Sequence, residues 1–197
     1  MKIKSINPAD NSIINEYNLH SDQAVNKMIN QSNQDFLVWR TLSFDDRREI
    51  LLKIAQKLSD DVEKHATMIS LEMGKPIKES RSEILKCVWV IEYYAENASE
   101  FLKPEKIESD YKDSYIQYDP LGVILGVMPW NFPYWQVFRF IAPSLMAGNT
   151  CVLKHASNVS GCALLIEELI NSVSDYKSIF KTLLISSSQV ENVIKNS

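Results

Sequence analysis

Apolar residues recur at helical spacing in the N-terminal half of the chain. One clear stripe, with members three or four residues apart, comprises Ile50, Leu51, Ile54, Leu58 and Val62. Such spacing places one face of a helix against a core, and Ser43 with Asp46 ahead of it forms a capping-box start. A looser stripe follows a cap formed by Ser21 and Asp22. We therefore predict two successive helices in this region.

A longer stripe predicts a helix over residues 77–102. Its apolar members are Ile84, Val88, Ile91, Ala95, Ala98 and Leu102. Ahead of it, Gly74 stands where a short preceding helix ends in the left-handed conformation, and Pro76 where that helix cannot continue. Residues 1–20 are polar and contain an Asn-Pro turn signal, so we predict one or two strands that wrap the edge of the body.

The pattern changes near residue 120 from helical stripes to short apolar runs. From there on, the expected elements are a strand at 123–128, a helix opened by Pro133 and closed by Gly148, a strand at 150–154, a helix from a Ser160 cap to residue 173, a strand at 183–185 and a short helix at 188–194. The first run is continuously apolar, which is typical of a strand covered on both faces. Alternating strands and helices imply parallel pairing through right-handed crossovers. We therefore predict an α/β fold, with an N-terminal helical segment and about half of a doubly wound, Rossmann-like parallel sheet.

We divide the chain into three parts. Residues 1–103 hold the N-terminal strands and helices that pack on the sheet, residues 104–119 form a linker hairpin of the kind used in oligomerisation, and residues 120–197 form a partial α/β unit. The linker is polar and rich in tyrosine, which suits an exposed or partner-facing strand.

Composition and charge exclude several classes of partner. The 197 residues carry a net charge of −4 with both signs interspersed, whereas a nucleic-acid or anionic membrane surface calls for a clustered basic face. The N-terminus has no apolar signal region and no run reaches a membrane-spanning length, so we expect a cytoplasmic protein. The cysteines Cys87, Cys151 and Cys162 lack metal-ligand spacing and lie in apolar stretches, so we predict neither a metal site nor a disulfide framework.

Polar side chains follow both buried strands at their carboxyl ends, which is where an open α/β sheet binds its ligand. Residues 128–131 and 154–157 meet there. An ammonium at Lys154 can hydrogen-bond ribose hydroxyls and attract an anionic dinucleotide, although spacing alone equally allows a lysine that ends a strand in water. By position alone, Asn131 is a cap or turn residue ahead of Pro133.

Three motifs in this region identify a family by resemblance. They are Pro129-Trp130-Asn131-Phe132-Pro133, Ala147-Gly148-Asn149-Thr150 and Val152-Leu153-Lys154. In this order and spacing they resemble the first cofactor-binding segment of the NAD(P)-dependent aldehyde dehydrogenases. The resemblance implies that residues 120–197 are a partial NAD(P)-binding unit. The cofactor contacts that it implies are Met128, Pro129, Trp130, Lys154 and Ser157.

The resemblance also gives Asn131 a catalytic role. Its amide would donate to the oxyanion that forms when a thiol adds to an aldehyde. Ser157 stands where many NAD-preferring relatives carry a glutamate that repels the added phosphate of NADP. A neutral serine removes that repulsion, so the expected cofactor is NADP, alongside or in place of NAD. The alternative for Ser157 is to help cap the following helix.

Arg139 is the candidate for substrate binding. It lies eight positions after Asn131, where succinate-semialdehyde dehydrogenases carry an arginine that grips the substrate carboxylate through paired donors. A structural ion-pair role on an apolar helix is an equal alternative. The nearby aromatic residues line a substrate tunnel or belong to the core: Trp130, Phe132, Trp135 and Phe138. We expect His155 to be solvent-exposed in a loop.

The resemblance covers nearly all of this chain but less than half of the family pattern. The family's glycine-rich segment, glutamate base and cysteine nucleophile have no match here, and Cys151, the thiol nearest Lys154, lies in a buried strand that suppresses its ionisation. We therefore expect the N-terminal part of an NAD(P)-dependent dehydrogenase that oxidises succinate semialdehyde to the carboxylic acid. We expect this part to be inactive alone, with homo-oligomeric intact relatives and a C-terminal half as its partner. The alternative is a non-catalytic nucleotide-binding or assembly module, or the remnant of a truncated gene.

Overall fold

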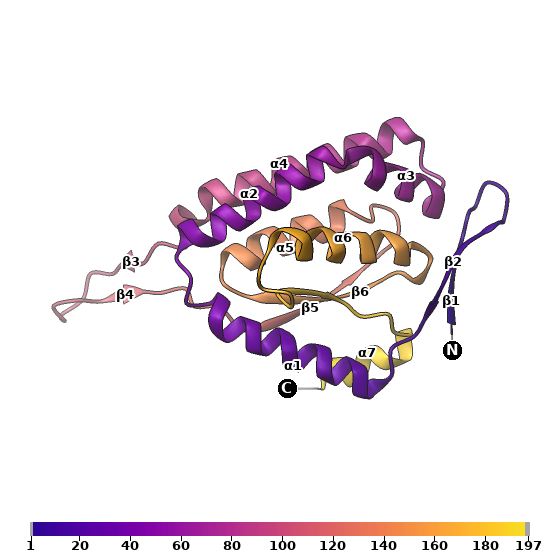
Figure 1. Cartoon of the computed structure of the whole chain (residues 1–197). Coiled ribbons are helices and arrows are strands. Elements are labelled where there is room, and N and C mark those ends of the chain that lie inside the picture. The colour runs from indigo at the N-terminus through magenta and orange to yellow at the C-terminus, as the bar shows by residue number, and fades with distance from the viewer. Residues whose placement is uncertain (1, 196–197) are drawn as a thin grey trace.

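The chain begins with a strand hairpin and four helices (Figure 1). The structure is a computed structural model that describes residues 2–195. In chain order these first elements are β1 (Lys2–Ile6), β2 (Ile13–Asn18), α1 (Asp22–Trp39), α2 (Phe44–Asp60), α3 (Val62–Met73) and α4 (Ile77–Phe101). β1 and β2 pair antiparallel, as the prediction of strands at the start of the chain requires.

The boundaries of these helices are set by the residues that the sequence indicated. The side chain of Ser21 accepts a hydrogen bond from the backbone of Ala24, and Ser43 and Asp46 form a reciprocal capping box. Gly74 ends α3 with a φ of 73°, a left-handed conformation that glycine adopts without steric cost. The predicted starts of α1 and α2 and the break after α3 are therefore confirmed.

The C-terminal half contains a short hairpin and a parallel sheet. Its elements are β3 (Glu105–Lys106), β4 (Tyr115–Ile116), β5 (Val123–Met128), α5 (Trp135–Met146), β6 (Thr150–His155), the 3₁₀ turn Ser157–Val159, α6 (Ser160–Val173), β7 (Phe180–Thr182), the 3₁₀ turn Ser187–Gln189 and α7 (Val190–Ile194). β5, β6 and β7 lie in that order and pair in parallel, with Met128 opposite His155 and Cys151 opposite Phe180. The predicted α/β fold with a half sheet is confirmed.

The third strand of this sheet lies earlier than predicted. β7 covers Phe180–Thr182, and the apolar run at 183–185 follows it. The sequence prediction missed this strand because it contains two polar residues, Lys181 and Thr182. Both are accommodated by α6, since Lys181 forms an ion pair with Glu167 (3.1 Å) and the Thr182 hydroxyl donates to a carbonyl of that helix. The apolar run contributes instead to a small core cluster between α1 and the sheet.

Two helices start differently from the prediction. α5 begins at Trp135 and not at Pro133, and α6 begins at Ser160 itself, whose hydroxyl donates back to the carbonyl of Ser157 (2.8 Å) instead of capping the helix. Neither helix has a cap from a side chain at its own N-terminus. Carboxylates from α3 and α4 take that place, as described below.

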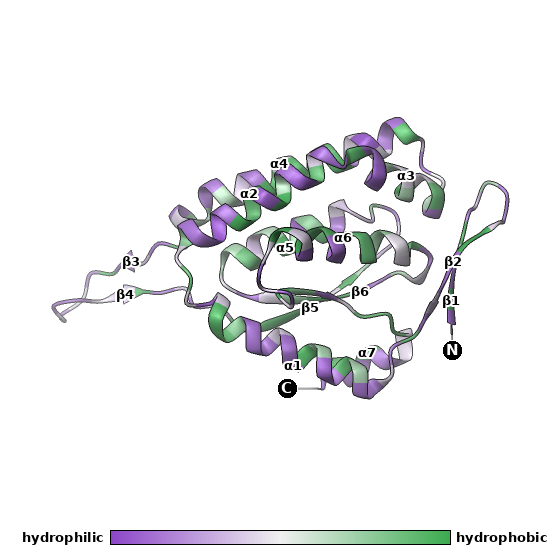
Figure 2. Ribbon diagram, in the orientation of Figure 1, coloured by the Kyte–Doolittle hydropathy of each residue, from purple (hydrophilic) through white to green (hydrophobic). Residues whose placement is uncertain are grey.

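Helices cover both faces of the sheet (Figure 1). α1 and α7 lie on one face and α5 and α6 on the other, while α2, α3 and α4 form an outer layer beyond α5 and α6. Figure 2 shows apolar residues concentrated in β5 and β6 at the centre, with polar and apolar residues mixed along α2 and α4. The main core extends from the outer layer through α5 and α6 to the sheet. Its largest fully buried side chains include Trp39, Tyr134, Phe138 and Phe180.

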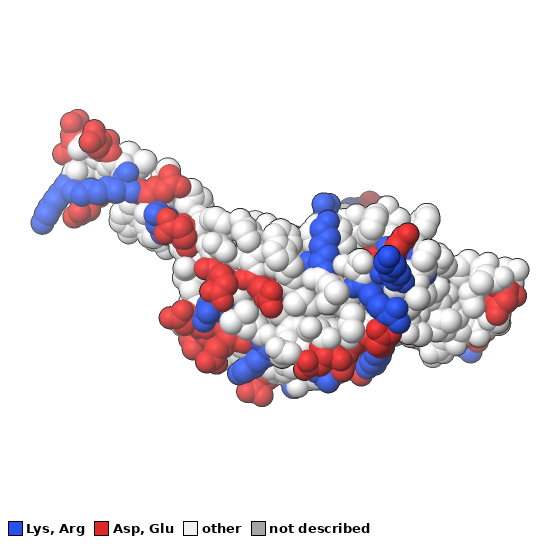
Figure 3. All heavy atoms as spheres, turned by 90° about the horizontal axis from the view of Figure 1, so that it is seen from above, with Lys and Arg blue, Asp and Glu red and all other residues white. Residues whose placement is uncertain are grey.

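β3 and β4 form an arm that projects from the body (Figure 1). Tyr111 and Tyr115 on this arm are 82% and 60% exposed, which agrees with the predicted exposed hairpin. On the face shown in Figure 3, acidic and basic side chains are interspersed without an extended basic patch. Within residues 2–195, no helix is both long enough and apolar enough to cross a membrane.

Candidate functional site

The carboxyl ends of β5 and β6 lie side by side. In the parallel register Val127 pairs with Lys154, and Met128 pairs with His155. The loops that follow the two strands therefore start from adjacent points at one edge of the sheet, where α/β sheets bind ligands. The loop after β5 carries Asn131, which is exposed.

His155 ties these two loops together. Its Nδ1 accepts a hydrogen bond from the backbone N–H of Ala156 (2.8 Å), so the ring proton is on Nε2, which donates to the carbonyl of Pro133 (2.9 Å). The side chain is only 6% exposed, so the prediction of an exposed loop histidine is wrong. Its polar atoms are satisfied by backbone groups at the strand ends, which permits burial. Burial lowers the pKa of His155 and favours the neutral ring.

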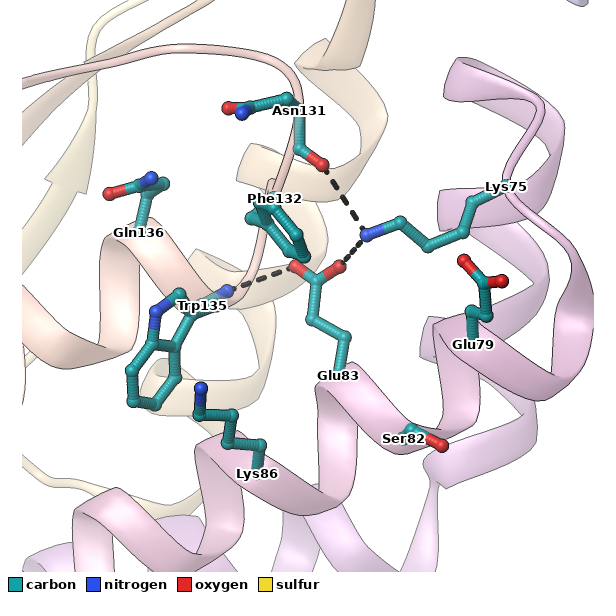
Figure 4. A pocket seen from close by; sticks show the side chains of 9 residues that line it. All are labelled: Lys75, Glu79, Ser82, Glu83, Lys86, Asn131, Phe132, Trp135 and Gln136. Carbon is teal, nitrogen blue, oxygen red and sulfur yellow. Dashed lines mark hydrogen bonds and ion pairs between the residues drawn. The ribbon is translucent and has the colours of Figure 1, made fainter.

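Glu83 and Lys75 hold the Asn131 loop from the outer layer (Figure 4). Glu83 Oε1 accepts from the backbone N–H groups of Tyr134 (2.9 Å) and Trp135 (3.0 Å). The ammonium of Lys75 forms an ion pair with Glu83 and donates to the backbone carbonyl of Asn131 (3.3 Å). One buried ion pair therefore holds the loop at the carbonyl of the asparagine and at the start of α5.

Sequence reasoning missed this pair. A usable signal was present, because Ser80, Glu83, Ile84 and Cys87 share the buried face of α4. A carboxylate on the apolar face of a helix needs a partner, and that partner is the start of α5.

A second buried glutamate caps α6. Glu72 accepts from the backbone N–H groups of Gly161 and Cys162 (both 2.8 Å) and from the hydroxyl of Ser5 (2.6 Å). Helix N-termini are anion-binding positions, and those of α5 and α6 are both occupied by carboxylates of this chain. They are thus closed to the phosphates of a dinucleotide.

The side-chain amide of Asn131 is free. Its backbone carbonyl is used by Lys75, but the amide makes no hydrogen bond to any of residues 2–195. The neighbouring ring of Phe132 lies 4.1 Å from the Lys75 ammonium, measured to the ring centroid. A held backbone with an unengaged amide is the arrangement that a preorganised hydrogen-bond donor requires.

Lys154 and Ser157 offer polar groups at the neighbouring strand end. Lys154 is partly buried, burial lowers its pKa, and it has no ion-pair partner among residues 2–195. Ser157 is exposed in the 3₁₀ turn after β6. Pro129 and Trp130, two of the other predicted contacts, are exposed in the loop after β5. An ammonium without a carboxylate beside exposed hydroxyl and apolar groups suits the ribose of a dinucleotide.

Two cavities lie between α4 and the start of α5. The first, about 580 Å³, is lined by Asn131, Phe132, Trp135 and Gln136 on one side and by α4 residues that include Glu83 and Lys86 on the other. The second, about 610 Å³, is lined by Met128, Trp135, Arg139 and Phe140 with Trp89 and Tyr93. Asn131 and Arg139 thus border different cavities, which share Trp135. Of the aromatic residues suggested for a substrate tunnel, Phe138 is instead part of the core.

The three cysteines are unsuited to nucleophilic attack. All are free and buried. Burial raises the pKa of Cys151 to about 12 and raises the pKa of Cys87 and Cys162 well above the ordinary value. The thiolate is the reactive form, so none supplies a nucleophile at neutral pH. In residues 2–195, no group of three His, Cys, Asp or Glu side chains could hold a metal ion.

Comparisons with known proteins agree on one family. A model of the aldehyde dehydrogenase family matches residues 1–197. A probable succinate-semialdehyde dehydrogenase (NADP(+)) of Synechocystis sp. is 45% identical over 185 residues, which make up 94% of this chain and 41% of the relative. The succinate-semialdehyde dehydrogenase (NADP(+)) of Mycobacterium avium is 40% identical over 200 residues, with 100% of this chain and 42% of the relative covered.

Solved structures give the same result. The succinic semialdehyde dehydrogenase of Streptococcus pyogenes, crystallised with NADP+, superposes with a TM-score of 0.93 at 33% identity and covers 98% of this chain and 42% of its own. A structure of Gox0499 gives a TM-score of 0.96 at 31% identity, covering 99% and 43%. The chain therefore spans about two fifths of the length of the proteins that it matches.

Proposed function

The chain belongs to the aldehyde dehydrogenase family, and from this premise we propose that it supplies the oxyanion donor and the ribose side of the cofactor site to an enzyme that oxidises an aldehyde to its carboxylic acid with NAD(P). One observation carries the proposal. The β5–β6 register brings the loop that carries Asn131 and the strand end that carries Lys154 to the same edge of the sheet. The hydrogen bond between His155 and Pro133 joins these two segments.

In this function Asn131 stabilises charge that develops during the reaction. When a thiolate adds to the aldehyde carbon, the carbonyl oxygen becomes an oxyanion, and a fixed amide donor stabilises it more than it stabilises the carbonyl. NAD(P), when bound, would supply the hydride acceptor that the oxidation requires. The thiolate comes from outside these 197 residues, because Cys87, Cys151 and Cys162 are buried and un-ionised. The chain on its own is then inactive.

Lys154 and Ser157 would hold the adenosine ribose. The ammonium of Lys154 would donate to ribose hydroxyls, and the neutral, exposed serine would not repel a 2′-phosphate as a carboxylate would. The names of the Synechocystis and Mycobacterium avium relatives, which specify NADP(+), support NADP as a cofactor. Since Glu83 and Glu72 occupy the N-termini of α5 and α6, the pyrophosphate is bound elsewhere.

The substrate that we propose is succinate semialdehyde. The support is the identity of 40–45% to succinate-semialdehyde dehydrogenases and the exposed guanidinium of Arg139, which lines a cavity one helical turn beyond Trp135. A guanidinium binds a carboxylate through paired donors.

Complementation tests the function. The chain is mixed with a polypeptide that comprises the part of the Synechocystis relative on the C-terminal side of the matched region, and NADPH formation from succinate semialdehyde is measured. We expect activity only with both polypeptides, and a loss of about a hundred- to a thousandfold in kcat for Asn131→Ala. Asn97→Ala, at a partly buried asparagine of α4 that lines neither cavity, is the matched control. Full activity of Asn131→Ala would overturn the proposal.

A second candidate is a non-catalytic nucleotide-binding or assembly module. The exposed tyrosines of the β3–β4 arm favour it, because such a surface suits contact with another chain. The same mixture separates the two functions. NADP binding and association without any aldehyde oxidation would support the module and contradict the enzyme.

A further inference from the structure

The two lysines that line the cavity beside Asn131 differ in their electrostatic state. The Lys75 ammonium is buried, paired with Glu83 and bonded to the carbonyl of Asn131, so its charge is neutralised within the protein. Lys86 is exposed on α4, and no carboxylate lies within ion-pair distance of it among residues 2–195. Lys86 is therefore the uncompensated cation of this cavity.

Trp135 fixes where the Lys86 charge lies. The ammonium lies 4.0 Å from the centroid of the Trp135 ring, a cation–π contact that holds the flexible side chain over the indole. In Figure 4 the side chain of Lys86 extends toward Trp135. The unpaired carboxylate of Glu79 also lines the cavity, but it lies seven residues earlier on α4, about 10 Å along the helix axis, on the side of Lys75.

Trp135 also separates this charge from that of Arg139. Arg139 follows Trp135 by one turn of α5 and lines the second cavity, which Trp135 shares, whereas Asn131 and Lys86 line the first. Trp135 thus lines both cavities, and of these two cations only Lys86 lines the same cavity as Asn131.

We infer that Lys86 is a carboxylate-binding residue, in addition to Arg139, for an anionic aldehyde whose carbonyl group lies at Asn131. This assignment rests on the proposed function and deepens it, because it names a charge that selects short aldehydes with a terminal carboxylate over uncharged ones. The apolar ring of Trp135 covers the methylene groups between the two ends of the substrate. A carboxylate beside the Lys86 ammonium gains an ion pair without displacing an existing one.

The chain itself permits a direct test. Succinate is the unreactive dicarboxylate probe, succinamide is its uncharged analogue, and NMR follows the indole N–H signal of Trp135, assigned with Trp135→Phe. We expect succinate, but not succinamide, to shift this signal, with binding weakened about tenfold by Lys86→Met, as expected for a charge-assisted hydrogen bond. Lys78→Met, an exposed lysine of α4 that lines neither cavity, is the matched control and should bind as the unchanged chain does.

The complemented enzyme gives the second readout. Lys86→Met should raise KM for succinate semialdehyde about tenfold and leave KM and kcat for butanal unchanged. Equal effects on both aldehydes, an unchanged succinate affinity in Lys86→Met, or no shift of the Trp135 signal by succinate would each overturn the inference. Oxidation of butanal tests the dehydrogenase function separately. A failure of the Lys86 assignment is therefore distinguishable from a failure of the proposed function.

Discussion

At the scale of single residues, the position of Asn131 depends on Glu83. This buried carboxylate makes two backbone hydrogen bonds at the start of α5 and neutralises Lys75. Glu83→Ala would leave a buried ammonium unpaired and two N–H groups unsatisfied, which costs about 3–5 kcal/mol. Urea unfolding measures this loss of stability. Glu79→Ala, one turn earlier on the same helix and exposed, should change the free energy of unfolding by less than about 0.5 kcal/mol. Equal stability of the two variants would contradict the account.

His65 makes stability depend on pH. It is buried against the hydroxyl of Tyr134 (2.7 Å), and burial lowers its pKa to about 4. In the unfolded chain histidine titrates near pH 6.5, so between about pH 6.5 and 4 the unfolded state binds more protons. The folded state is therefore destabilised as the pH falls through this window. Urea midpoints should decrease from pH 7 to pH 4.5, and His65→Gln should reduce the slope. A flat profile would show that His65 is accessible to protons in the folded chain.

The thiols give a third prediction at this scale. Because Cys87, Cys151 and Cys162 are buried and their pKa values are raised, a disulfide reagent at pH 8 should modify none of them in the folded chain and all three in urea. Rapid modification of a cysteine under native conditions would contradict the conclusion that none of the three thiols supplies the nucleophile.

At the scale of elements, the helix ends that the sequence predicted correctly are those that depend on neighbouring residues. The caps of α1 and α2 and the left-handed end of α3 depend on residues within a few positions, and the sequence predicted them. The starts of α5 and α6 depend on Glu83 and Glu72, which lie 51 and 89 positions away, so local motifs at Pro133 and Ser160 misplaced them. The burial of His155 likewise depends on a carbonyl of the neighbouring loop.

Gly161 tests the contact between α3 and α6. A Cβ added there would lie 2.8 Å from Glu72 Oε1 and 2.9 Å from the sulfur of Met68. Gly161→Ala should therefore displace the capping carboxylate and cost about 1–3 kcal/mol, the usual range for overpacking. A pair of variants at an exposed position of the same helix, Glu168→Gly and Glu168→Ala, measures the change in helix propensity alone. A stabilised Gly161→Ala variant would mean that helix propensity outweighs the lost cap.

At the scale of the whole molecule, the parallel half sheet and its helical layers followed from periodicity, because each element buries one apolar face. The site was predicted less completely. The motifs near Asn131 and Lys154 are contiguous in sequence, whereas Lys75, Glu83 and Lys86 reach them only through the packing of α4 on α5. The spacing along α4 indicates that Glu83 is buried, but it does not indicate which residues Glu83 contacts.

The claim on which this account rests is that Asn131 and Lys154 face one dinucleotide cleft, and NMR titration of the chain with NADP+ tests it most directly. The account predicts that backbone signals of residues 129–131 and 154–157 shift together with one affinity, and that Lys154→Met weakens that affinity about tenfold, as loss of a charge-assisted hydrogen bond should. Shifts at only one of the two strand ends, or at neither, would contradict it.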